Sequence, residues 1–119
     1  MDTSPEYINM CKKATELQET WEPTEGDWFV LYDEIENIGD YSQDLHPINY
    51  REEFPISKKN CTWLPRVDQQ IALSNMPWQE FLFEMVEYSA GISESAEIAA
   101  LHSLMELLYK KEWKREDWI

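Results

Sequence analysis

Cysteine and histidine are the residues of this sequence with the most direct chemistry, because a thiol beside an imidazole makes a nucleophile. The chain contains Cys11, Cys61, His46 and His102. The cysteines lack C-x-x-C spacing, and the histidines lack the H-x-E and H-E-x-x-H spacings of zinc deaminases and hydrolases. A zinc site and a disulfide framework are therefore not indicated, and we expect free thiols. A Cys–His pair stays open, since such partners meet in space rather than in sequence order.

Carboxylates are the second source of chemistry. The stretch Asp33-Glu34-x-Glu36 offers oxygen ligands of the kind that hard cations prefer. The twelve-residue calcium loop, with its central Gly and closing Glu, is absent, so we expect a solvated acidic loop here. Three isolated glycines also leave no Gly-rich phosphate loop. We therefore predict no metal, no cofactor and no enzymatic activity.

Residues 61–71, CTWLPRVDQQI, combine an arginine with several polar side chains. One interpretation is a working site around Arg66. The other is a corner between a strand and a helix, where Arg66 pairs with a carboxylate and Asp68 lies in the positive first turn of the helix. Trp63 and Leu64 would then fill core space. Both interpretations stay open at the level of the sequence.

The elements that hold these residues predict an α+β fold in a single domain spanning residues 1–119. Ser4-Pro5-Glu6 is typical of a helix start, and we expect that helix to run from about Pro5 to Thr20. The β-branched and aromatic run 28–32 is the best strand candidate. Residues 48–50 and 54–56 are possible partner strands, which gives a small antiparallel sheet of two or three strands.

The C-terminal half is predicted to be helical. A first helix begins at Pro65 and ends before Pro77, where a second helix begins and continues to Gly91. We expect the second helix to hold its apolar residues on one side, namely Trp78, Phe81, Leu82, Met85 and Val86. The last helix is expected to be capped by Ser93 and to carry an apolar stripe of Ile98, Leu101, Leu104, Met105, Leu107 and Leu108.

A basic cluster follows the last helix. Lys110, Lys111, Lys114 and Arg115 complement the negative end of its dipole, so local stability explains most of the cluster. The tail KKEWKREDW, with its two tryptophans, could equally dock back onto the body of the protein.

The net charge restricts the possible partners. Acids outnumber bases 24 to 10, for a formal net charge of −14. Direct nucleic-acid binding and attachment to an anionic membrane both need clustered lysines and arginines, so neither is expected. The start of the chain lacks the apolar core of a secretory signal, and no stretch of the sequence is apolar enough to span a bilayer. A basic protein is the partner that fits, and the cytoplasm is the expected location.

Between Ala14 and Tyr50 the sequence has many acids and no lysine or arginine. Rows of like charge destabilise a helix slightly, so a purpose other than folding is indicated. We expect these carboxylates to imitate the phosphates of a nucleic acid and to occupy a basic groove. The predicted partner-binding residues are Glu16, Glu19, Glu22, Glu25, Asp27, Asp33, Glu34, Glu36, Asp40 and Asp44, together with Arg66.

Three stretches of the sequence carry a resemblance. EYINMCKKATELQETWEPTEGDWFV, TWLPRVDQQIAL and the closing YKKEWKREDW are together similar to a group of short proteins encoded by phages and prophages of Gram-positive bacteria. The group's motifs are W-x-P-x-x-G-D, W-L-P-R-x-D-Q and a Trp-rich tail. Here Lys114-Arg115-Glu116 replaces the more usual Asp-Gly-Glu. The resemblance implies a phage origin and a bacterial cytoplasm, and it carries over no catalytic residue.

The function predicted from the sequence is therefore binding. We expect a small acidic phage protein that inhibits or regulates a host protein of nucleic-acid handling or defence through an anionic face. The alternative is a non-enzymatic adaptor or a subunit of a phage assembly. In that case a homodimer is possible, with Trp113 or Trp118 in the contact.

Overall fold

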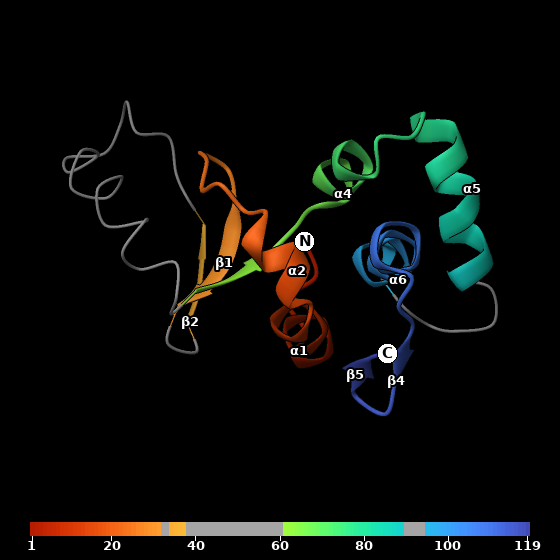
Figure 1. The fold of residues 1–119 in the computed structure, drawn as a ribbon. Coiled ribbons are helices and arrows are strands. Elements are labelled where there is room, and N and C mark those ends of the chain that lie inside the picture. The colour runs from red at the N-terminus through yellow and green to blue at the C-terminus, as the bar shows by residue number, and fades with distance from the viewer. Residues whose placement is uncertain (32–33, 38–60, 90–94) are drawn as a thin grey trace.

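The computed structural model describes residues 1–31, 34–37, 61–89 and 95–119 of the 119-residue chain. Within them, the helices lie to one side of a small antiparallel sheet, and a β-hairpin closes the chain (Figure 1). The predicted α+β architecture is confirmed. In chain order the elements are α1 (Pro5–Lys13), α2 (Thr15–Glu19), β1 (Trp28–Leu31), β2 (Glu34–Asn37), β3 (Cys61–Leu64), α4 (Val67–Ser74), α5 (Trp78–Ser89), α6 (Ala96–Tyr109), β4 (Trp113–Lys114) and β5 (Asp117–Trp118).

The opening helix starts as predicted but ends early. The Ser4 side chain accepts a hydrogen bond from the backbone N–H of Tyr7 and so caps α1. A single helix to Thr20 was wrong, because Ala14 leaves the helical region with φ −83° and ψ 66° and separates α1 from α2. The break lets Gln18 of α2 turn toward β3, where its side-chain amide bonds to the backbone.

The sheet has the order β2-β1-β3, with both pairings antiparallel. The strand predicted at 28–32 is confirmed for its described part, which is β1, whereas the partner strands expected at 48–50 and 54–56 lie outside the described residues. The acidic loop expected at 33–36 was wrong for its described part. Residues 34–37 form β2, in which Ile35 pairs with Val30 between two glutamates. That alternation of polar and apolar residues is the period of a strand.

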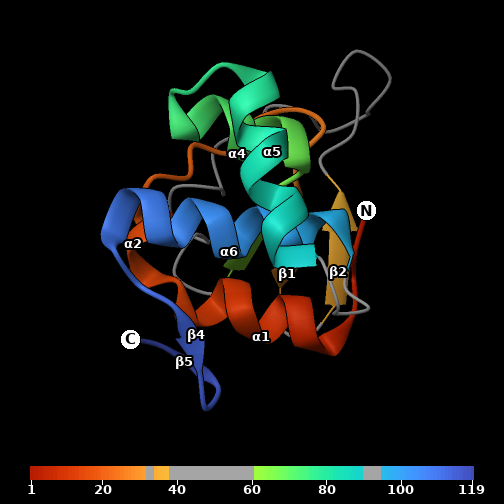
Figure 2. The ribbon, with the colours of Figure 1, turned by 90° about the vertical axis from the view of Figure 1, so that its right-hand side faces the viewer.

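The helical C-terminal half is confirmed, with shifted starts. α4 begins after Pro65, with Arg66 as its N-terminal cap residue. α6 is capped by the side chain of Ser95, which accepts from the N–H of Ile98, so the predicted cap at Ser93 was wrong. Figure 2 shows α5 crossing over α6, and α4 also packs on α6.

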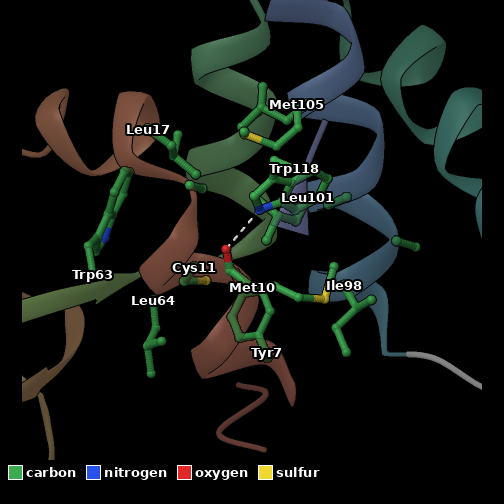
Figure 3. Packing of buried hydrophobic residues seen from close by; sticks show 14 of the residues in the cluster. Tyr7, Met10, Cys11, Leu17, Trp63, Leu64, Ile98, Leu101, Met105 and Trp118 are labelled. Atoms are coloured by element: carbon green, nitrogen blue, oxygen red, sulfur yellow. Dashed lines mark hydrogen bonds between the residues drawn. The ribbon is translucent and has the colours of Figure 1, made fainter. Parts of the chain in front are cut away.

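One cluster of buried residues joins α1, α2, β1, β3, α5, α6 and the hairpin. Figure 3 shows Trp118 of β5 packed beside α1 and α6. Its indole Nε1 donates to the carbonyl oxygen of Met10 at 2.9 Å, and Glu112 and Ile119 exchange two backbone hydrogen bonds at the base of the hairpin. α6 ends at Tyr109, and the tail after it docks on the body of the protein through Trp118. The interpretation that the Trp-rich tail docks back is the one that the structure supports.

Candidate functional site

The predicted acidic tract is spread over three elements. Glu16 and Glu19 lie in α2, Glu22, Glu25 and Asp27 lie in the turn before β1, and Glu34 and Glu36 lie in β2. Asp33, Asp40 and Asp44 lie outside the described residues. The described acids therefore do not form one row along a helix, and each group has its own surroundings.

Asp27 does not belong to an outward acidic face, and its assignment as a partner-binding residue is corrected. The residue is 2% exposed. One carboxylate oxygen accepts from Trp21 Nε1 at 2.8 Å and from the N–H of Thr24 at 2.9 Å. The other accepts from Gln69 Nε2 at 2.6 Å. A buried carboxylate has to be satisfied in this way, so Asp27 organises the turn internally.

Arg66 also acts within the fold. Its guanidinium donates to the carbonyl oxygen of Gly26 at 2.7 Å and to Asp68 Oδ1 at 3.0 Å, and it lies 3.7 Å from Asp27 Oδ1. The hydrogen bond from Arg66 holds the pKa of the Asp68 carboxyl below its ordinary value. The backbone N–H of Arg66 donates to Gln69 Oε1 at 2.9 Å, so the Gln69 side chain satisfies one backbone donor at the start of α4. These contacts favour the architectural interpretation of the corner.

The segments W-x-P-x-x-G-D (21–27) and W-L-P-R-x-D-Q (63–69) thus bind each other. Besides the polar contacts, the Trp21 and Trp63 rings stack with centroids 6.2 Å apart and planes 4° from parallel. Gly26 has φ +92°, a conformation that side-chain-bearing residues rarely adopt. The two segments make one interlocked unit that supports the turn carrying Glu22 and Glu25.

Glu16 is neutralised by a distant base. Lys111 Nζ lies 2.7 Å from Glu16 Oε2 and connects α2 to the segment after α6. The hydrogen bond from Lys111 holds the pKa of the Glu16 carboxyl below its ordinary value. Glu16 is therefore not an uncompensated charge, and its place in the anionic face is corrected as well.

The remaining described acids of the tract lie at the surface. Glu19, Glu22, Glu25 and Glu34 are exposed, and Glu36 is half-buried. No lysine or arginine in the described parts of the chain forms an ion pair with Glu22, Glu25, Glu34 or Glu36. These four side chains from the turn and β2 are named here the anionic surface.

Apart from Arg66, the described lysines and arginines lie in residues 12–13 and 110–115. Lys13 Nζ donates to the carbonyl oxygen of Glu116 at 2.7 Å, so these two segments meet at the hairpin. Figure 1 and Figure 2 both show β2 well separated from the β4–β5 hairpin, with α1 between them. The bases of these two segments are therefore remote from the anionic surface, whereas Arg66 contacts its turn at Gly26.

The nucleophile candidates have surroundings that favour packing. Cys11 is fully buried, and burial raises the pKa of its thiol far above the ordinary value. Burial also raises the pKa of the half-buried Cys61. Because the thiolate is the nucleophile, neither environment activates a cysteine. His102 lies edge-on to Trp118, with ring centroids 5.9 Å apart, and His46 lies outside the described residues.

Within the described ranges, no group of three or more His, Cys, Asp or Glu side chains is arranged to hold a metal ion. None of the helices in those ranges is long and apolar enough to cross a lipid bilayer. Comparison with protein-family models, curated proteins and solved structures gave no match.

The sequence missed the outward side of α5. The prediction placed Trp78 and Val86 with the core residues Phe81 and Met85, but both are exposed, and so is Phe83. The apolar residues of α5 could have indicated this side, because they cover a wider part of the helix surface than a single buried face needs.

Proposed function

We propose that this chain is a non-enzymatic binding protein that engages a basic surface of another protein through the anionic surface of Glu22, Glu25, Glu34 and Glu36. In the setting that the sequence resemblance implies, it is a phage product that inhibits or regulates a host protein of nucleic-acid handling or defence in the bacterial cytoplasm. One observation carries the proposal. Four carboxylates of the turn and β2 lie at or near the surface, and none of them forms an ion pair with a described lysine or arginine, since Arg66 is engaged with Gly26, Asp27 and Asp68.

Electrostatic attraction would drive this interaction. Exposed charges of one sign steer an oppositely charged partner and raise the association rate, an effect that salt screens. A groove built to bind nucleic acid is lined with lysine and arginine and is therefore the complementary surface. Glu16 and Asp27 are not part of this interaction, because both are engaged within the fold.

A second candidate is an adaptor or assembly subunit, and the exposed apolar side chains of α5 favour it. Trp78, Phe83 and Val86 are 56%, 71% and 63% exposed. Apolar side chains at these positions add nothing to a purely electrostatic contact, but they suit a lasting interface.

Affinity capture from a bacterial host lysate tests the proposal. We expect the wild-type chain to retain a basic protein, and the purified pair to weaken steeply as salt rises. The variant Glu22→Gln, Glu25→Gln, Glu34→Gln, Glu36→Gln should lose most of the affinity. A control with the same change in net charge is Glu6→Gln, Glu106→Gln, Glu112→Gln, Glu116→Gln, and it should bind like wild type. Binding that is insensitive to salt, or equal losses in both variants, would contradict the proposal.

A further inference from the structure

Helix α5 lies at the periphery of the molecule, where one side of it packs on α6 and the other faces outward (Figure 1). Phe81 and Met85 fill the side toward α6 and are buried. At 100° per residue, an apolar strip extends from beside the buried Met85 round to the outward side over roughly 140°, defined here as Trp78, Leu82, Val86 and Phe83. Leu82 is half-buried, whereas the other three are largely exposed.

A ridge of acids runs beside this strip. Glu80, Glu84 and Glu87 follow one another at four- and three-residue steps and are exposed. The helix contains no lysine or arginine, whereas Lys110, just after α6, lines a cleft together with Glu84. Like charges at these spacings slightly destabilise a helix, and nothing within α5 compensates them.

We propose that the outward side of α5 is a docking surface for a basic amphipathic helix of a partner protein. Apolar side chains of that helix would cover the apolar strip, and its lysines or arginines would pair with Glu80, Glu84 and Glu87. This is the helix-on-helix mode of recognition, with anchors at three- and four-residue steps. The surface differs from the anionic surface of the turn and β2, so the inference goes beyond the proposed function.

Charge complementarity selects this occupant. A second copy of the chain would bring two ridges of acids together without a base on either helix, and like charges across an interface are unfavourable. An anionic membrane or a nucleic acid would be repelled by the same carboxylates. Aromatic residues such as Trp78 and Phe83 are typical anchors of protein interfaces.

The test uses two synthetic peptides of identical leucine and lysine composition. One places its leucines on one face of a helix, and the other has a scrambled order. We expect the amphipathic peptide to bind the full chain and to shift amide NMR signals of α5, and the scrambled peptide to bind about tenfold or more weakly. The variant Phe83→Ser, Val86→Ser should weaken binding of the amphipathic peptide by about tenfold or more. Circular dichroism checks that this variant is folded, as the exposure of both side chains predicts.

The control variant Ile35→Ser, Ile119→Ser changes two exposed apolar side chains outside α5 and should bind like wild type. The Glu22, Glu25, Glu34, Glu36 variant should also bind the amphipathic peptide normally, which separates this inference from the proposed function. Equal binding of both peptides, or NMR shifts confined to β2 and its turn, would overturn the proposal. So would a dimer, seen by sedimentation, that Phe83→Ser, Val86→Ser abolishes, because the occupant would then be a second copy.

Discussion

The side-chain amide of Gln18 pairs with the backbone of Trp63 as the next strand of the sheet would. The N–H of Trp63 donates to Gln18 Oε1 at 2.7 Å, and Gln18 Nε2 donates back to the carbonyl oxygen of Trp63 at 2.9 Å. The same nitrogen donates to the carbonyl oxygen of Cys11 at 3.0 Å, where α1 ends. One glutamine thus satisfies the outward backbone groups of Trp63 at the edge of β3 and the carbonyl of Cys11 at the helix break.

Replacing Gln18 with Ala should therefore lower the free energy of unfolding by about 1–3 kcal/mol, because backbone groups of Trp63 lose their partners. Urea denaturation followed by circular dichroism measures the change. The control is Lys12→Ala, on the exposed side of α1, which we expect to change stability by less than about 0.5 kcal/mol. A Gln18→Ala protein as stable as this control would show that water replaces the amide without loss.

Asp27→Asn should destabilise the protein by about 3 kcal/mol, because an amide nitrogen would replace a carboxylate oxygen facing Gln69 Nε2 or Trp21 Nε1. Asp68→Asn makes the same chemical change at an exposed partner of Arg66 and should cost below about 1 kcal/mol. Thermal and urea unfolding of both variants provide the comparison. Similar losses of stability in the two variants would contradict the role of Asp27 as the buried acceptor that organises the turn.

The Glu16–Lys111 ion pair should make stability depend on pH. The pKa of Glu16 is lowered from 4.5 by the hydrogen bond from Lys111, so the contribution is present above pH 4.5 and is lost as pH falls through the folded-state pKa. The pair is partly exposed, so its contribution is below about 1 kcal/mol. The difference in unfolding free energy between wild type and Lys111→Met should shrink toward zero in acid. A Glu16→Gln background should remove that pH dependence.

The closing hairpin should be open to stabilisation. Arg115 and Glu116 occupy its two turn positions with φ of 53° and 62°, as in a type I′ turn, where Asn and Gly are favoured. Arg115→Asn, Glu116→Gly should therefore raise the free energy of unfolding by about 1 kcal/mol, measured by urea denaturation. Lys110→Gly, at the left-handed position after α6, should stabilise by a similar amount. Lys111→Gly has no such conformation to relieve and should destabilise.

Local signals in the sequence determined the longer helices and the first strand. The Ser4 cap, the aromatic run of β1 and the apolar spacing of α5 and α6 each lie within a few residues of one another, so propensity and periodicity were sufficient. The acidic composition also determined which classes of partner are favoured. Composition did not determine which carboxylates face outward, because it does not distinguish one acid of the tract from another.

The tertiary structure decided the break at Ala14, the burial of Asp27 and the neutralisation of Glu16. Each depends on a partner remote in sequence: Gln18 bonds to a residue 45 positions away, and Asp27 to one 42 positions away. It also decided that α5 faces the core with Phe81 and the surface with Phe83. Helical spacing determines which residues share a face, but only the packing of α6 against α5 selects the face that is buried.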